Sequence, residues 1–111
     1  MILMISSQGK ELTSTIDDRF GRCQWLIKYD TETKQSEAFQ NPGLKQSGGA
    51  GVAAAQFVID QNVDVAISGD FGPHAANALR AGNIQMFVFD HNLGKVDDVI
   101  DTFLKGNLPA F

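Results

Sequence analysis

The sequence predicts an α/β fold in three layers, in which one mixed five-stranded sheet carries three helices. Three strand-like segments come first in the chain, and helical segments then alternate with two short apolar runs. Strands joined by short turns pair antiparallel, whereas strands joined through a helix pair parallel and cross over right-handedly. We therefore expect the strand order 3-2-1-4-5, with strand 2 antiparallel to its neighbours.

The first three segments are expected to form the antiparallel part of the sheet. An apolar strand over Met1–Ser6 comes first, and a second strand over Gln24–Asp30 places its large apolar side chains at alternate positions. The polar stretch Lys34–Gln40 follows after a turn, and its composition is typical of an edge strand. Asn41-Pro42-Gly43 ends this strand.

The rest of the chain is expected to alternate helices and parallel strands. Val63–Ser68 and Ile84–Phe89 are short and almost continuously apolar, which is typical of strands covered on both faces. An alanine-rich helix is expected over Val52–Asn62, before the first of these strands. Each strand is followed by a loop and a helix, so the two segments form βα units.

The two further helices carry their own start and stop signals. One begins at Pro73, a residue suited to the first helical position, and stops at Gly82, a residue suited to the position after a helix. The other begins at Val96, has its apolar side chains on one face, and stops at Gly106. The tail Asn107–Phe111 is expected to be loose.

Composition and charge exclude several classes of protein. The chain has 111 residues with 43% hydrophobic content, which fits a single domain over residues 1–111. A net charge of -4 argues against a nucleic-acid partner, which would require clustered Lys and Arg. No apolar run approaches the roughly 20 residues that span a bilayer, so no membrane partner is expected. One cysteine and a short apolar start without a basic flank lead us to expect a cytoplasmic protein.

Three glycine-marked loops are expected to meet at one edge of the sheet. They are Asp17–Cys23, Gly48–Gly51 and Gly69–Pro73, and we call them together the rim. Strand direction places them at the edge where the parallel strands end, which is where open α/β sheets usually bind ligands. Helix N-termini at this edge offer unpaired N–H groups and a positive dipole end, so the rim is suited to an anion. The pair Asp17-Asp18 is expected to be a solvated turn.

An ordered set of short motifs runs along nearly the whole chain. In chain order the motifs are Asp18-Arg19-Phe20-Gly21-Arg22, Asn41-Pro42, Gly49-Ala50-Gly51, Val63-Asp64-Val65-Ala66-Ile67-Ser68-Gly69, Gly72-Pro73 with Ala75, Leu79 and Ala81-Gly82, and the final helix Val96–Gly106. In this order they resemble the dinitrogenase iron-molybdenum cofactor biosynthesis family. The resemblance implies a ribonuclease-H-like fold motif and a single domain similar to the iron-molybdenum-cofactor-binding domains of that family.

The resemblance also implies a function. Similar proteins bind or carry an iron-sulfur or iron-molybdenum-sulfur cluster as small scaffold or delivery proteins, and their partners are the proteins that donate or accept the cluster. We therefore expect a role in metal-cofactor assembly, transfer or storage. No set of nucleophile, base and acid is visible, so we do not expect an enzyme. The exposed edge strand makes a homodimer a further candidate.

The expected cluster-binding residues lie on the rim. They belong to its glycine loops and are Arg19, Phe20, Gly21, Arg22, Gly49, Gly51, Gly69 and Gly72. Similar proteins often carry histidine where this chain has Arg19, and arginine cannot ligate a metal. Its guanidinium can instead neutralise an anionic cluster and donate hydrogen bonds to the sulfides, and so can that of Arg22. A second explanation of the glycines is conformational, because turns need them.

Three residues are candidate metal ligands: Cys23, His74 and His91. Thiolate is the preferred ligand of iron-sulfur clusters, and the neighbouring arginines are expected to favour the thiolate form of Cys23. A lone cysteine is also explained as a small buried hydrophobe, and His74 as a solvated side chain. The three residues are candidates for a mixed ligand set. The other interpretation has one ligand or none, with the cluster held by backbone N–H groups and arginines.

A second function is a nucleotide-binding or anion-binding regulatory module that uses the same rim. Gly49-Ala50-Gly51-Val52-Ala53-Ala54 fits the pattern G-x-G-x-x-A of dinucleotide-binding loops, and Asp70 lies about twenty residues further on. That pattern normally follows the first strand of a βαβ unit directly. Here the polar loop Asn41–Ser47 separates the helix from an edge strand, which weakens the likeness.

Overall fold

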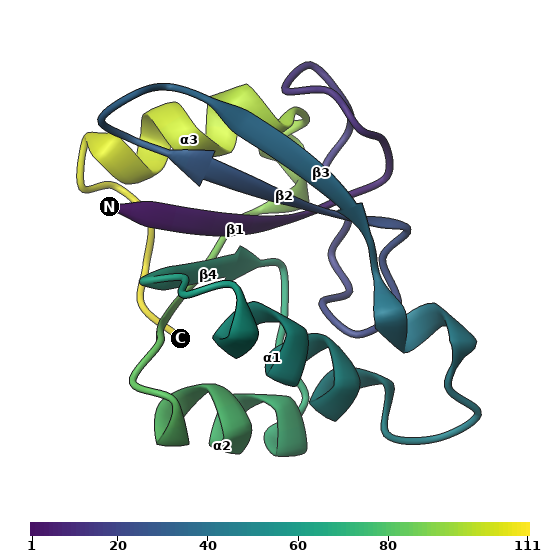
Figure 1. The fold of residues 1–111 in the computed structure, drawn as a ribbon. Helices are drawn as coiled ribbons and strands as arrows, with labels where there is room; N and C mark the ends of the chain where they lie inside the picture. The colour runs from purple at the N-terminus through teal and green to yellow at the C-terminus, as the bar shows by residue number, and fades with distance from the viewer.

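The computed structural model describes all residues from Met1 to Phe111, and it contains the predicted mixed sheet. The five strands lie in the order β3-β2-β1-β4-β5 (Figure 1). The pairs β1–β2 and β2–β3 are antiparallel, whereas β1–β4 and β4–β5 are parallel, so the predicted topology is confirmed. The elements are β1 (Ile2–Ser7), β2 (Trp25–Asp30), β3 (Ser36–Gln40), the 3-10 helix η1 (Pro42–Lys45), α1 (Ala50–Asp60), β4 (Val65–Ser68), α2 (Pro73–Ala81), β5 (Gln85–Val88), the 3-10 helix η2 (His91–Leu93) and α3 (Val96–Leu104).

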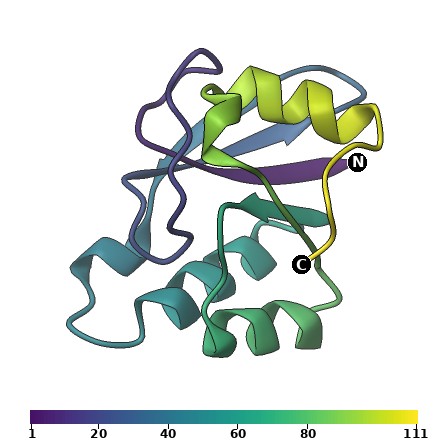
Figure 2. The same ribbon diagram turned by 180° about the vertical axis from the view of Figure 1, so that it is seen from behind.

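Helices cover both faces of the sheet, which gives the three expected layers (Figures 1 and 2). Helices α1 and α2 lie side by side on one face, and α3 lies on the other. Alternate residues of β1 serve the two layers, because Met4 joins the core under α1 and α2 whereas Leu3 and Ile5 join the core under α3. The central strand β1 is therefore the common wall of both cores.

The first helix begins and ends two residues earlier than the sequence predicts. Gly49 has φ 71° and ψ 25° at the N-cap, and this left-handed turn lets the chain enter the helix at Ala50. At the other end Asn62 has φ 57°, which is incompatible with continuing the helix. Local backbone conformation, which the alanine-rich pattern does not report, thus sets both ends. None of the helices has the length and hydropathy that crossing a membrane requires.

The C-terminal tail is ordered against the sheet, so the expectation of a loose tail is wrong. The amide of Val88 donates to the Pro109 carbonyl at 2.9 Å, and the amide of Phe111 donates to the Met86 carbonyl at 3.0 Å. Leu108 is buried in the core under α3. The physical reason is that the outer edge of β5 offers unpaired backbone groups, and the tail supplies partners for them.

Backbone segments touch directly where the rim meets α1. A Cβ atom built on Gly21 would lie 2.9 Å from the Cα of Gly51, which is closer than real Cβ contacts allow. A Cβ on Gly43 would overlap the Gly21 carbonyl oxygen. These glycines are needed for close approach and not for positive φ, since neither has a left-handed backbone. The contact sets how near the Asp17–Cys23 loop sits to the start of α1.

We predict that Gly21→Ala lowers the free energy of unfolding by about 1–3 kcal/mol, because the added methyl group must push two backbone segments apart. The matched control is Gly48→Ala, since a Cβ on Gly48 meets nothing within 4 Å. That variant is expected to stay within about 0.5 kcal/mol of the parent. Urea unfolding followed by circular dichroism measures both. Equal midpoints for the two variants would contradict the close-contact explanation.

Candidate functional site

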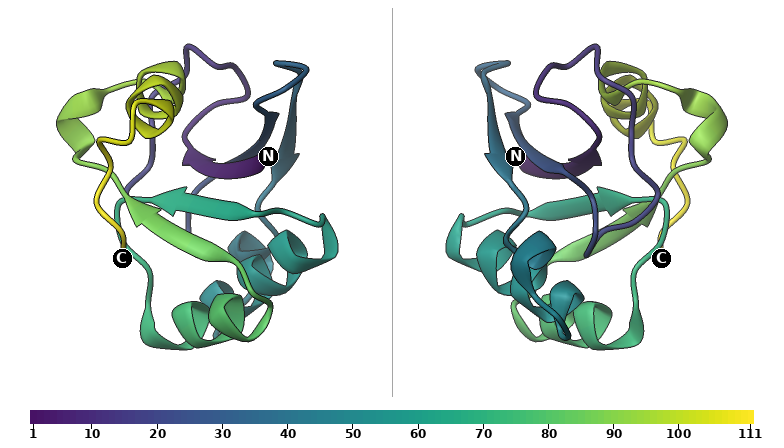
Figure 3. Two further views of the ribbon diagram at one scale, coloured as in Figure 1. Left: turned by 90° about the vertical axis from the view of Figure 1, so that its left-hand side faces the viewer. Right: turned by 90° about the vertical axis from the view of Figure 1, so that its right-hand side faces the viewer.

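The rim loops meet in space as the strand directions predict. Arg19 and Asp70 form an isolated parallel bridge between the first and third loops. The rings of Phe20 and Phe71, one from each loop, pack with centroids 5.1 Å apart. The second loop joins them through the contact of Gly21 with the start of α1 described above. Figure 3 (right panel) looks onto this edge of the molecule. The predicted convergence of the three loops is confirmed.

Two helix N-termini lie next to each other on the rim. Gly51 occupies the second position of α1, and a Cβ built there would lie 3.1 Å from the Cβ of Ala75, at the third position of α2. The N-cap residues are Gly49 and Gly72, so no side chain caps either helix. Neither helix has an acidic residue in its first turn. The first amides and the positive dipole ends of both helices are therefore left for a ligand.

The third helix differs, although it also starts at the edge where the parallel strands end. Its first amides are used by the loop after β1, because Val96 donates to the Ser14 carbonyl at 3.0 Å and Asp97 to the Leu12 carbonyl at 2.8 Å. Asp97 and Asp98 place negative charge in its first turn. Its N-terminus is therefore satisfied within the protein. Only the paired starts of α1 and α2 combine free donors with uncompensated dipoles.

The two rim arginines have different electrostatic surroundings. The side chain of Arg19 donates to Asp17 through Nε and Nη2, each at 3.2 Å, and the Arg19 amide donates to Asp17 Oδ1 at 2.9 Å. This hydrogen bonding and the carboxylate charge raise the pKa of Arg19. Asp17 is 5% exposed, so the expectation of a solvated Asp17 turn is wrong. A buried carboxylate needs a partner, and Arg19 is that partner.

Arg22 keeps its positive charge uncompensated. Its Nη1 donates to the carbonyls of Gln46 at 2.9 Å and Gly43 at 3.4 Å, and no carboxylate lies within ion-pair distance. The guanidinium thereby holds the loop that leads into α1, with further N–H donors still free. Both arginines were expected to neutralise an anion. The surroundings favour Arg22 for that role, because Asp17 already neutralises Arg19.

Cys23 lies in the core beneath the rim. The residue has 0% exposure, its Sγ accepts a hydrogen bond from Asn41 Nδ2 at 3.3 Å, and it lies 3.4 Å from the Phe20 carbonyl oxygen, to which it donates. Burial raises the pKa of the thiol to about 12. The expectation that nearby arginines favour the thiolate is wrong, because desolvation of the sulfur outweighs the attraction of exposed guanidinium groups. Of the alternatives left open, the structure favours the small buried hydrophobe.

The two histidines are exposed and separate from Cys23. His74 occupies the second position of α2, and His91 lies in η2 with its Nδ1 3.8 Å from an Asp90 carboxylate oxygen. No group of three or more His, Cys, Asp and Glu residues is arranged to hold a metal ion. The structure therefore does not bring Cys23, His74 and His91 together as a mixed ligand set. The thiol belongs to the core, whereas both rings lie on the surface.

His91 and Arg19 share the border of a hollow of about 400 Å³. Asp17 and Asp18 line the same hollow, and Asp90 lies next to His91. Carboxylates outnumber the cationic groups there, so this hollow does not favour an anion. The anion-favouring part of the rim is the opposite one, where Arg22 and the start of α1 lie.

Asn41 organises the rim, and sequence reasoning missed this role. Its side chain is 2% exposed and uses both polar ends. The Oδ1 atom accepts from the Gly43 amide at 2.9 Å, while Nδ2 donates to the Phe20 carbonyl at 3.0 Å and to Cys23 Sγ. One amide thus joins the Asp17–Cys23 loop to η1. The signal in the sequence was an Asn before Pro at a strand end, which suggests an N-cap but not its distant partners.

Comparison with known proteins places these features in a wider group. Residues 1–106 match the model of a protein family described as dinitrogenase iron-molybdenum cofactor. An uncharacterized protein of Methanocaldococcus jannaschii is 26% identical over 99 residues, which are 86% of this chain and 82% of that protein.

Two solved structures are similar over almost their whole length. The apo form of the orange protein from Desulfovibrio gigas superposes with a TM-score of 0.93 at 30% identity, over 99% of this chain and 92% of that one. The NMR structure of a candidate NifB protein from Thermotoga gives a TM-score of 0.83 at 30% identity, over 98% and 91% of the two chains.

The raised pKa of Cys23 predicts a pH dependence of stability. The thiol of the unfolded chain ionises near its ordinary pKa of 9.0, whereas the folded protein keeps the proton up to about 12. The contribution of this thiol to the free energy of unfolding is therefore fully present below pH 9. It is lost as the pH rises from 9 to 12, by up to about 1.4 kcal/mol per pH unit. Urea unfolding over this range measures it, with Cys23→Ala as the control that lacks this slope. Parallel pH profiles for the two proteins would contradict the buried-thiol explanation.

Proposed function

The chain belongs to the dinitrogenase iron-molybdenum cofactor family, and on that premise we propose that it binds and carries an iron-sulfur or iron-molybdenum-sulfur cluster. The cluster is cargo that the protein holds during metal-cofactor assembly, transfer or storage, and the protein catalyses no reaction of its own. Its partners are the proteins that donate and accept the cluster, and its place is the cytoplasm.

The observation that carries this proposal is the pair of uncapped helix N-termini on the rim. Metal-sulfur clusters carry negative charge on sulfides that accept hydrogen bonds. The first turns of α1 and α2 offer backbone donors and two dipole ends within one contact distance of each other, at Gly51 and Ala75. Arg22 adds an uncompensated charge beside the loop that enters α1. This local positive region lies on a chain whose net charge is -4.

The donor set supports holding the cluster without a bond from protein to metal. The one thiol is buried and protonated, and no ligand group of His, Cys, Asp and Glu is assembled. In this proposal the backbone amides and Arg22 contact the outer sulfides of an anion whose metals are already coordinated. Such a complex can be released without breaking a metal–protein bond, which suits a protein that passes its cargo on.

A nucleotide-binding or anion-binding module is the second candidate, and one observation favours it. The Gly49–Ala54 pattern lies at the N-terminus of α1, where phosphate-binding loops place their glycines. However, α1 follows η1 and not a strand of a βαβ unit, unlike the loops that define the pattern. The two candidates share the anion site and differ in the ligand, so the same experiment separates them.

We predict that the anaerobic apo-protein retains a cluster after incubation with iron and sulfide, or retains tetrathiomolybdate, through gel filtration. Visible absorption and bound metal measure the retention. Cys23→Ala is expected to retain the same amount, because the thiol does not contact the cargo. No retained metal under any of these conditions, together with retention of ATP, would replace the cluster proposal by the nucleotide candidate. Loss of cargo in a folded Cys23→Ala protein would overturn binding without thiolate.

A pair of substitutions at Gly72 tests the helix N-terminus itself. Gly72 has φ -66° and ψ 159°, and a Cβ there meets nothing within 4 Å, so both Asp and Asn fit as N-caps. Each is expected to stabilise the protein by a few tenths of a kcal/mol. We predict that Gly72→Asp weakens cluster binding at least about fivefold relative to Gly72→Asn, because only Asp adds a negative charge. Equal affinities of the two variants would place the anion away from α2.

A further inference from the structure

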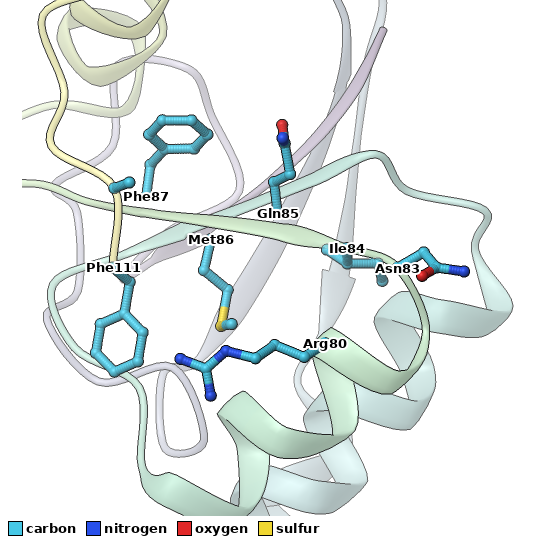
Figure 4. Close-up of a pocket in the computed structure, with 8 residues that line it drawn as sticks. Arg80, Asn83, Ile84, Gln85, Met86, Phe87 and Phe111 are labelled. Atoms are coloured by element: carbon cyan, nitrogen blue, oxygen red, sulfur yellow. The ribbon is translucent and has the colours of Figure 1, made fainter.

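A second pocket lies at the other end of α2, away from the rim. It has a volume of about 440 Å³ and is bounded by α2, β5 and the C-terminal tail. Figure 4 shows the residues that line it, with the Arg80 guanidinium pointing toward the Phe111 ring and the Met86 side chain extending from β5 toward the same space. The volume is in the range of pockets that hold small organic molecules.

Arg80 is the only residue with a charged side chain that lines this pocket, and no side-chain carboxylate pairs with it. The guanidinium makes no ion pair with a carboxylate, and no hydrogen bond holds it to a protein acceptor. Its one defined contact is with the Phe111 ring, whose centroid lies 5.9 Å from Cζ. The planar fork of N–H donors is therefore free for an anion, and its geometry matches a carboxylate.

Apart from the polar side chains of Asn83 and Gln85, the other walls of the pocket are apolar. Met86 and Ile84 are 6% and 4% exposed, so they are parts of the core that the pocket reaches. Phe111 is 45% exposed, but its position is set from two sides: its amide donates to the Met86 carbonyl, and its ring packs against Phe71 with centroids 5.2 Å apart. A wall that is already in place lowers the entropic cost of binding.

We propose that this pocket binds a small carboxylate that has an aromatic or branched apolar group. The carboxylate meets the guanidinium of Arg80, and the apolar group lies against Phe111 and the Met86 thioether, which makes favourable contacts with aromatic rings. The site is chemically distinct from the rim, because it uses the C-terminal end of α2 and the cation Arg80, and it touches the rim only through the packing of Phe111 on Phe71. The proposal for this pocket can therefore be tested separately from cluster binding.

The test is a titration of the full chain with phenylacetate, followed by ¹H–¹⁵N NMR. We expect saturable shifts centred on residues 80–87 and 110–111. The variant Arg80→Gln is expected to weaken the binding of phenylacetate at least about tenfold, since it removes the charged donors from an exposed position without altering the core. Lys45→Gln is the control, because it removes an exposed positive charge elsewhere on the surface, and it is expected to leave the affinity unchanged.

Two further probes test the roles of the carboxylate and of the apolar group separately. Benzyl alcohol lacks the carboxylate, so its weaker binding is expected to be the same in the parent and in Arg80→Gln. Acetate lacks the apolar group and is expected to produce no saturable shifts at this pocket. Phenylacetate shifts spread over the whole surface, or an equal affinity in Arg80→Gln and the parent, would overturn the proposal.

Discussion

The backbone contact between Gly21 and Gly51 is the constraint on which the rim depends. Because neither residue carries a side chain, the Asp17–Cys23 loop approaches the first turn of α1 more closely than any Cβ would permit. The same small surface of Gly51 lets α2 begin against α1, at Ala75. Asn41 then locks the arrangement by bonding to both the loop and η1. The N-termini of α1 and α2 can lie next to each other only because no side chain separates the backbone segments at this place.

Burial decides which charges on the rim are paired and which stay free. Asp17 is inside the protein and takes Arg19 as its partner, whereas Arg22 bonds only to carbonyl groups and stays cationic. The α3 N-terminus is closed by the loop after β1 and by its own acidic residues, while the starts of α1 and α2 stay open. The result is one positive region beside a hollow rich in carboxylates. An acidic chain can still present a local positive region because these charges are separated in space.

Some of the site was predictable, and the reason is strand direction. Alternating and continuous apolar patterns predict which segments pair antiparallel or parallel, and this order places the loops that contain Phe20 and Phe71 at one edge. The chemistry of individual residues was less predictable. Whether Cys23 is a thiolate depends on the water around its sulfur, and the chain neighbours Arg19 and Arg22 suggest the wrong answer because they point to solvent while the thiol points into the core.

The sequence by itself determined the strand order, the helix boundaries marked by Pro73 and Gly82, and the meeting of the glycine loops, since these follow from periodicity and local backbone preference. Only the tertiary structure decided which arginine is neutralised, that the tail pairs with β5, and that Asn41 joins two loops. Each of these depends on contacts between residues that local patterns do not relate. Desolvation and pairing energies depend on how the whole chain packs, so a short sequence segment cannot predict them.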